Sequence, residues 1–436
     1  MKLRSLILAI IILGALAGTL YWSERHKPAD DTAKAADASP SILKLDEASI
    51  TKVELKIKDA EPIVLAKNNS GAWQITAPKQ YSADAANVSS TLSSLSALNS
   101  ERVIEDKAAD LKPYGLNPPN VELDITEKDN KSQKLLLGDD TPAGSGVYAM
   151  LAGDPRVFTI ASFNKSTIAK SLSEFRDKRL LQVNVDQVSR IELLRKNQTI
   201  EFGRTKDTWQ ILQPKPMRAD GLQVSQFMQK LTDAKMDLAG SGNAKESVTA
   251  FNSGAPVATV KLTDPSGTQT LQIKKSKNDY YAKSSAVDGV YKVNADLGQA
   301  VDKEVDDFRN KKLFDFGFND PDKIEIHSGA KTAALTKTGN DWLSNGKKMD
   351  GDSVQSLLSN LSFITADKFV DSGFENPTIE ATVTSDAGKH TEQISLAKTS
   401  DGYIAKRDND TSLYHVQSSS VDAIQKAFDD LKPASK

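Results

Sequence analysis

The stretch Phe175-Arg-Asp-Lys-Arg-Leu-Leu-Gln-Val-Asn-Val-Asp-Gln-Val-Ser-Arg-Ile-Glu-Leu193 decides how the chain is organised, because a variant of it returns further on. The second copy reads Phe308-Arg-Asn-Lys-Lys-Leu-Phe-Asp-Phe-Gly-Phe-Asn-Asp-Pro-Asp-Lys-Ile-Glu-Ile326, and its first and last residues both lie 133 positions after their counterparts. Solenoid units are about 20–50 residues long, so a period of this size corresponds to a whole domain. The sequence therefore predicts tandem domains of one kind.

Length and composition agree with several folded domains. The chain has 436 residues, of which 39% are hydrophobic and 26% charged. That is longer than one hydrophobic core usually supports and typical of globular rather than disordered proteins. Lysine and arginine number 56 against 58 acidic residues, a net charge of −2 that does not favour nucleic acid as a partner. Because the chain has no cysteine, disulfides, thiolate metal sites and a cysteine nucleophile are excluded.

The N-terminus has the pattern of a membrane anchor. Lys2 and Arg4 precede Leu6 to Trp22, an uninterrupted uncharged run close to the roughly 20 residues that cross a bilayer. The two cations favour a cytoplasmic N-terminus and export of the remainder. We expect a signal anchor or transmembrane helix over residues 1–22, which places the protein in the inner (cytoplasmic) membrane with its bulk periplasmic or extracytoplasmic.

A cleavable signal peptide is the alternative interpretation of this segment. Ala15-Leu16-Ala17 is an A-x-A pattern behind an apolar core, as at a signal-peptide cleavage site. The apolar run continues past it to Trp22, which favours a retained anchor. Residues 23–41 are rich in Ala, Asp, Lys and Pro without apolar periodicity, so we expect a flexible tether there.

The remainder divides into three expected α+β repeats, residues 42–180, 181–313 and 314–436. In the first, short apolar runs predict three antiparallel opening strands, and Asp84 is positioned to cap an amphipathic helix over Ala85 to Leu98. Four further strands follow, and a closing helix is expected over Lys165 to Lys178. The three opening strands are predicted at Val53–Ile57, Ile63–Leu65 and Ala72–Thr76, and the four later ones at Val121–Ile125, Lys134–Leu137, Val147–Leu151 and Val157–Ile160.

Aromatic and acidic landmarks recur in the same order in the other two repeats. A tryptophan ends each opening group of strands, and an aspartate precedes each predicted inserted helix. This recurrence predicts one fold class throughout: α+β, with a mainly antiparallel sheet, one inserted helix and one connecting helix in each repeat. The landmarks are Trp73 with Asp84, Trp209 with Asp220, and Trp342 with Asp350.

Several of these segments together resemble a known bacterial family. They are Trp73-Gln-Ile-Thr-Ala-Pro78, Tyr81-Ser-Ala-Asp84, Leu111 to Pro119, Leu136-Leu-Gly-Asp139, Gly146-Val-Tyr148 and Phe175-Arg-Asp-Lys-Arg179. The pattern is similar to domain of unknown function 4340, most closely over residues 45–200. That family has no established activity, so the resemblance implies no catalytic residue. Its members are often encoded near ABC transporters of the gliding-motility type, which implies envelope assembly or transport as a context.

Residue sets for catalysis or cofactor binding are not evident. The chain has four histidines, and none of them is spaced as metal ligands are. His327, His390 and His415 all fall in the third repeat, but exposed structural histidines are commoner than a metal site. Gly138 to Gly146 lacks the lysine of a phosphate-binding loop and is better interpreted as a hairpin connection. We therefore expect no metal, no cofactor and no enzymatic activity.

The repeats contain two sets of candidate interaction residues. Each tryptophan could form an exposed platform for a glycan or peptide, or could seal its own sheet against the inserted helix, and we favour the second interpretation. The basic blocks at the start of each quoted stretch are expected near a helix end, where they either complement the helix dipole or make a salt-sensitive contact with an acidic partner. These sets are Trp73, Trp209 and Trp342, and Arg176, Lys178, Arg179, Arg309, Lys311 and Lys312.

The sequence favours a membrane-anchored scaffold or accessory subunit that binds envelope proteins, with subunits of an ABC transporter as candidate partners and no role for nucleic acid. The alternative is a module that binds envelope glycan or peptidoglycan, which requires exposed equivalent aromatic residues. An uncharacterised hydrolase comes third, because it requires a cleft with converging carboxylates.

Overall fold

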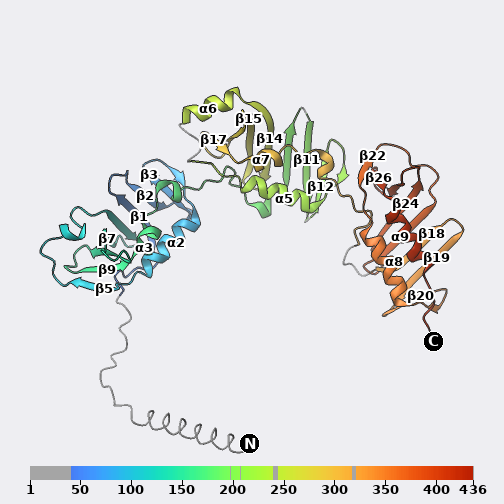
Figure 1. The fold of residues 1–436 in the computed structure, drawn as a ribbon, viewed down its shortest axis with the longest axis horizontal. Coiled ribbons are helices and arrows are strands. Elements are labelled where there is room, and N and C mark those ends of the chain that lie inside the picture. The colour runs from blue at the N-terminus through green and yellow to red at the C-terminus, as the bar shows by residue number, and fades with distance from the viewer. Residues whose placement is uncertain (1–40, 197, 207, 239–243, 317–320, 436) are drawn as a thin grey trace, which may run out of the picture. The chain divides into compact units, whose positions relative to one another are not determined.

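The computed structural model describes residues 41–196, 198–206, 208–238, 244–316 and 321–435. The predicted anchor over residues 1–22 and almost all of the predicted tether lie outside these residues. Within the described part of the chain, no helix is both long enough and apolar enough to span a membrane. The chain divides into two compact units, with the boundary between Asp177 and Lys178. Figure 1 shows one sheet in the first unit and two in the second.

The first sheet has nine strands in the order β4-β3-β2-β1-β6-β7-β8-β9-β5, paired antiparallel throughout. Its strands are β1 Ile50–Ile57, β2 Ile63–Lys67, β3 Trp73–Ala77, β4 Tyr81–Ser82, β5 Arg102–Glu105, β6 Val121–Glu127, β7 Ser132–Asp140, β8 Gly146–Leu151 and β9 Val157–Ala161. Its helices are α2 Ala85–Ser96, α3 Ser162–Ile168 and α4 Leu172–Phe175, with a 3-10 turn η1 at Lys112–Tyr114.

The second sheet has the order β13-β12-β11-β10-β14-β15-β16-β17 among the described residues. Its strands are β10 Arg190–Arg195, β11 Gln198–Thr205, β12 Thr208–Gln213, β13 Met217–Arg218, β14 Ala255–Asp264, β15 Gly267–Ser276, β16 Asp279–Ser284 and β17 Val290–Val293. The helices are α5 Gly221–Thr232, α6 Ala244–Ser253 and α7 Ala295–Ala300, with 3-10 turns η2 at Val185–Gln187 and η3 at Val305–Asp307.

The third sheet again has nine strands, in the order β21-β20-β19-β18-β23-β24-β25-β26-β22. Its strands are β18 Pro321–Ser328, β19 Lys331–Thr338, β20 Asp341–Ser344, β21 Lys347–Lys348, β22 Lys368–Val370, β23 Ile379–Ser385, β24 His390–Lys398, β25 Tyr403–Arg407 and β26 Leu413–Val416. The helices are α8 Gly351–Phe363 and α9 Ser418–Asp429. The shared strand order confirms the α+β class and the three related sheets.

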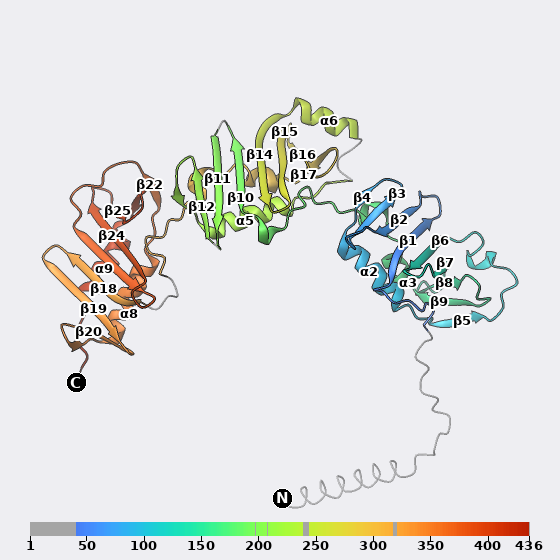
Figure 2. The ribbon, with the colours of Figure 1, turned by 180° about the vertical axis from the view of Figure 1, so that it is seen from behind.

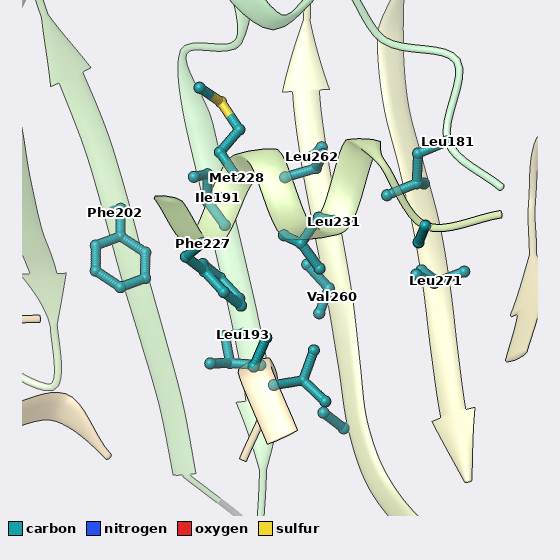
Figure 3. Packing of buried hydrophobic residues seen from close by; sticks show 14 of the residues in the cluster. Leu181, Ile191, Leu193, Phe202, Phe227, Met228, Leu231, Val260, Leu262 and Leu271 are labelled. Atoms are coloured by element: carbon teal, nitrogen blue, oxygen red, sulfur yellow. The ribbon is translucent and has the colours of Figure 1, made fainter. Parts of the chain in front are cut away.

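Each sheet has a hydrophobic core of its own. Strand residues alternate between buried and accessible, as in β6 and β23, so one face of each sheet is packed and the other meets solvent. In the second core, Phe227, Met228 and Leu231 of α5 lie against strand residues that include Ile191 and Leu262 (Figure 3). Helices and sheet therefore form two layers.

The accessible faces carry ladders of alternating charge. In the first sheet, the Lys56 ammonium lies 3.3 Å from Glu54 and 3.1 Å from Glu122, and the Lys134 ammonium lies 3.0 Å from Glu122. Hydrogen bonds from Lys134 and Lys56 hold the pKa of Glu122 below its usual value. Such half-exposed pairs keep a bare sheet face soluble and contribute little stability, typically about 0–1 kcal/mol each.

The capping aspartates act as expected. The Asp84 carboxylate accepts from the N–H of Asn87 at 2.9 Å, Asp220 accepts from Leu222 and Gln223, and Asp350 accepts from Ser353 at 3.0 Å. Each bond satisfies a donor that the first turn of a helix otherwise leaves unpaired. The three inserted helices thus start for the same local reason.

The predicted closing helix over Lys165–Lys178 is wrong. The chain forms α3, breaks, and restarts at α4, where Ser171 and Glu174 make a capping box. After Phe175 the backbone of Arg176 is extended, because this segment pairs with another part of the first unit. The sequence also gave no sign of β4 and β5, since strands of two to four residues carry too few positions for an apolar alternation.

We predict that Asp84→Ala, Asp220→Ala and Asp350→Ala each lower the free energy of unfolding by about 1 kcal/mol, because each leaves helix N–H groups without an acceptor. Chemical denaturation of the full chain measures this. Asp422→Ala, at an exposed aspartate in α9, is the control and should change stability by less than about 0.5 kcal/mol. Equal effects from all four variants would contradict the capping role.

Candidate functional site

The quoted stretch joins consecutive cores. Phe175 is buried in the first core, whereas Leu180, five residues later, is buried in the second. In the second copy of the stretch, Phe308 is buried in the second core and Leu313 in the third. The Phe308 ring lies 5.0 Å from the ring of Phe202 and makes an edge contact with it. We call residues 175–180 and 308–313 the seams.

The upstream half of each seam pairs with the short segment before the inserted helix of the same repeat. At the first seam, the N–H of Asp84 donates to the carbonyl of Phe175 at 2.7 Å, and the N–H of Asp177 donates to Ser82 at 2.9 Å. In the third repeat, the segment after α9 pairs in the same way with the residues before α8. The opposed residues are Ala83 with Arg176, Ala219 with Arg309, and Met349 with Pro433.

The downstream half pairs with the segment that follows the inserted helix of the next repeat. The N–H of Leu180 donates to Ala234 at 2.9 Å, and at the second seam the N–H of Leu313 donates to Ile364 at 3.1 Å. The opposed residues are Ser41 with Asn99, Arg179 with Lys235, and Lys312 with Thr365. The polar backbone of a seam is therefore satisfied on both sides of the point where one core ends and the next begins.

A glutamine side chain clamps the start of each of the first two sheets. Gln133 on β7 accepts from the N–H of Lys44 at 3.3 Å and donates to the carbonyl of the same residue at 2.8 Å. Gln269 on β15 does the same for Gln182, at 2.7 Å and 3.0 Å. A carboxamide can accept and donate at once, so it completes both hydrogen bonds of one peptide position.

The third sheet has Glu392 at this position, and its chemistry differs. Both carboxylate oxygens accept from the N–H of Asp315, at 3.0 and 2.9 Å, but a carboxylate cannot donate. Arg407 on β25 pairs with this carboxylate at 2.9 Å and also donates to the carbonyl of Leu313. In the second repeat the equivalent carbonyl, that of Leu180, accepts from the hydroxyl of Ser284. The Glu392 and Arg407 side chains are only 4% and 11% exposed, so the pair needs its complete set of partners.

Arg218 on β13 extends this polar cluster from the second sheet to the third. Its Nη1 donates to the carbonyl of Lys312 at 2.9 Å and to the hydroxyl of Tyr414 at 3.2 Å, and its Nη2 pairs with Asp315. The Asp315 carboxylate in turn lies 3.8 Å from Arg407. Arg218 is therefore one side chain of the second sheet that contacts both the second seam and a strand of the third sheet.

Tyr414 on β26 links this cluster to Asp410, because its hydroxyl accepts from Arg218 and donates to Asp410. Its hydroxyl donates to Asp410 at 2.5 Å, and burial together with that carboxylate raises the pKa of Tyr414 to about 12. Burial works against ionisation of Asp410, but hydrogen bonds from Tyr414 and Ser412 hold the Asp410 pKa below its usual value. Beside Asp410, the loop with Phe374 and the turn between β25 and β26 enclose an open pocket of about 780 Å³.

Two predicted site residues, Arg176 and Arg309, stack on aromatic rings. The Arg176 guanidinium lies 4.1 Å from the centre of the Tyr81 ring, within the first unit. Arg309 lies 3.4 Å from the centre of the Phe369 ring on β22 and pairs with Asp306 at 2.9 Å. Equivalent arginines thus pack in opposite directions, Arg176 onto the repeat before its seam and Arg309 onto the repeat after it.

The four remaining basic residues of the seams are more accessible. Arg179, Lys311 and Lys312 are exposed and Lys178 is half-buried. The Lys311 ammonium donates to the carbonyl of Asp367 at 3.1 Å. The second seam therefore presents two adjacent exposed cations next to the Arg218 cluster.

The tryptophans do not form three equivalent exposed platforms. Trp209 and Trp342 are 5% and 8% exposed and belong to the second and third cores, as the sheet-sealing interpretation expects. Trp73 differs, because it is half-buried and packs at the margin of the first core. The requirement of the glycan-platform alternative, three exposed equivalent aromatic residues, is therefore not met.

The three histidines of the third repeat do not form a metal site. His415 is buried and bonds Asp367 at 2.7 Å, His327 bonds Thr332, and His390 lies 3.7 Å from Glu392. Within the described ranges, no three acidic or histidine side chains are grouped as metal ligands. Gly138–Gly146 does connect β7 to β8 as a hairpin, as expected.

The chain belongs to a defined protein class. The family described as Domain of unknown function (DUF4340) matches it twice, over residues 73–216 and 209–382. Together these matches cover well over half of the chain, so the chain is a member of that family. Both matches begin at the tryptophan of an opening strand group, Trp73 and Trp209, and run through a seam. Among curated proteins, none matches the chain.

We predict that Arg218 and Asp315 are energetically coupled. In a double-mutant cycle with Arg218→Ala and Asp315→Ala, the coupling should be about 1 kcal/mol or more, because the pair is partly desolvated and shares its partners with Arg407 and Tyr414. Denaturant unfolding of the full chain gives the four free energies.

The control cycle uses Lys348 and Asp341. Lys348 occupies the position of Arg218 in the third repeat, and its ammonium lies 2.8 Å from Asp341 with both side chains about half exposed. This cycle should give about 0.5 kcal/mol or less. A coupling at Arg218 no larger than the control would show that the cluster does not hold the second seam.

Proposed function

We propose that the protein is a membrane-anchored, non-enzymatic scaffold or accessory subunit of the cell envelope. The N-terminal segment holds it in the inner membrane, and the three sheets extend on the periplasmic side. There it binds protein partners, with ABC transporter subunits as the first candidates and without nucleic acid. The charge pattern of residues 1–22 and the context implied by the family resemblance support this assignment.

The single observation that carries the proposal is the Arg218 cluster. Its cations and carboxylates are bonded to one another and to the seam backbone. These contacts join the second and third sheets, which belong to one compact unit. Such a unit positions neighbouring surfaces for a large partner without paying for their ordering on binding. The exposed cations of the second seam lie beside it and form the expected contact for an acidic partner surface.

The experiment is crosslinking of the full-length protein in its own membranes, followed by purification and identification of bound proteins. We expect stoichiometric transporter or envelope subunits, and their loss from a version lacking residues 1–40. If no protein is recovered in stoichiometric amount from the full-length chain, the scaffold proposal is wrong.

Charge-reversal variants locate the contact. Lys311→Glu with Lys312→Glu should weaken recovery of the partner at low salt, and the difference from the unaltered chain should shrink as salt is raised, because exposed charges are screened. Lys347→Glu with Lys348→Glu is the matched control, since these two adjacent exposed lysines lie on the edge strand β21. Loss of the partner in the control alone would place the contact at that edge instead.

A further inference from the structure

The first repeat contains a pocket that the scaffold role does not use. It is lined by residues 46–48 together with residues of β2, β3 and the first turns of α2. Figures 1 and 2 label β2, β3 and α2 in the same part of the first unit. Its volume is about 480 Å³, within the range of about 300–1,000 Å³ of small-molecule sites. The lining includes Asp46, Glu47, Lys67, Trp73, Ser89 and Leu92.

Trp73 is what distinguishes this pocket from the corresponding places in the other repeats. Trp209 and Trp342 are almost fully buried, whereas Trp73 is half-buried and lines the cavity. An indole that is packed on one side and accessible on the other offers a flat apolar surface with polarisable electrons. Leu92, 3% exposed, continues the apolar lining on the helix side.

The polar lining groups retain hydrogen-bonding capacity. Glu47 accepts one hydrogen bond, from Ser93 at 2.9 Å, and Asp46 accepts from the N–H of Ala48 at 3.1 Å. An ionised carboxylate offers about four acceptor positions, so both can accept more. Ser89 is exposed, and its hydroxyl both donates and accepts.

The charges in the pocket select the class of ligand. The Lys67 ammonium lies 5.2 Å from the centre of the Trp73 ring and already makes the cation–π contact that a cationic ligand would seek. An anion would meet the carboxylates of Asp46 and Glu47. A neutral ligand with many hydroxyls avoids both repulsions, because its hydroxyls can donate to the carboxylates and accept from Lys67, while its C–H face covers the indole.

We propose that this pocket binds a sugar ring of a neutral oligosaccharide, stacked on Trp73 and hydrogen-bonded by Asp46, Glu47 and Lys67. The site belongs to the first repeat and does not depend on the protein-binding role. One aromatic platform with three polar side chains is a small site, so we expect weak binding, in the micromolar to millimolar range, that strengthens when the chain is held close to a polymeric glycan.

The test is isothermal titration of the detergent-solubilised full chain with chitotetraose, cellotetraose and maltotetraose. At least one of the three should bind, and Trp73→Ala should weaken it about tenfold or more. Glu47→Gln keeps the shape and removes one charge, so it should weaken binding even if Trp73→Ala proves unstable. Trp342→Phe, at the buried equivalent, is the control and should bind as the unaltered chain does.

Three results would overturn the proposal. The first is no binding of any of the three sugars at millimolar concentration. The second is binding that Trp73→Ala and Glu47→Gln leave unchanged, since the sugar would then occupy another surface. Tighter binding of tetramethylammonium or of an oligogalacturonate than of the neutral sugars would assign the pocket to cations or to anions and would also refute it. None of these results bears on recovery of protein partners.

Discussion

The whole arrangement depends on how the chain passes from one core into the next. At each seam the backbone pairs first with the preceding repeat and then, from the next residue, with the following repeat. The change falls between Asp177 and Lys178 at the first seam and between Asn310 and Lys311 at the second. Phe175 and Phe308 anchor the upstream side, and Leu180 and Leu313 anchor the downstream side. An extended segment with unpaired peptide groups between two cores would be costly, so this double pairing is what permits connections only a few residues long.

The second seam carries an ionic cluster, formed by Arg218, Asp315, Glu392 and Arg407. The position of Arg218 is occupied by Ser82 in the first repeat and by Lys348 in the third, and that of Asp315 by Gln182. Where the first two sheets have a glutamine clamp, the third has Glu392, whose nearly buried carboxylate can accept hydrogen bonds but cannot donate one. Arg407 pairs with that carboxylate and also donates to the carbonyl of Leu313. The ionic cluster thus includes the one clamp position that holds a carboxylate in place of a carboxamide, and Arg218 joins it to the second sheet.

The sequence predicted those features that recur in each repeat and that depend on a short stretch of neighbouring residues. The capping aspartates, the opening strands and the tryptophans all have short-range patterns, and they predicted the three sheets correctly. The clamp left a signal too, in Ser132-Gln133, Thr268-Gln269 and Thr391-Glu392, each followed by one polar residue and then an apolar strand residue, but nothing local shows what such a side chain bonds. The seam itself was mistaken for the end of a helix. Its extended shape is imposed by partners about 90 residues away in sequence, such as Ala83 for Arg176, which no local periodicity reveals.

Because seam amides donate to backbone carbonyls on both sides, they should be as well protected from exchange as the amides of the sheets. Native-state hydrogen exchange of the full chain, read by mass spectrometry of peptides covering residues 175–184 and 308–316, measures this directly. We expect the amides of Asp177, Leu180, Asn310 and Leu313 to exchange as slowly as those of the neighbouring strands, because each donates to a backbone carbonyl. Exchange as fast as that of the exposed turn after β15, which Lys277 begins, would contradict it and would make the seams simple linkers.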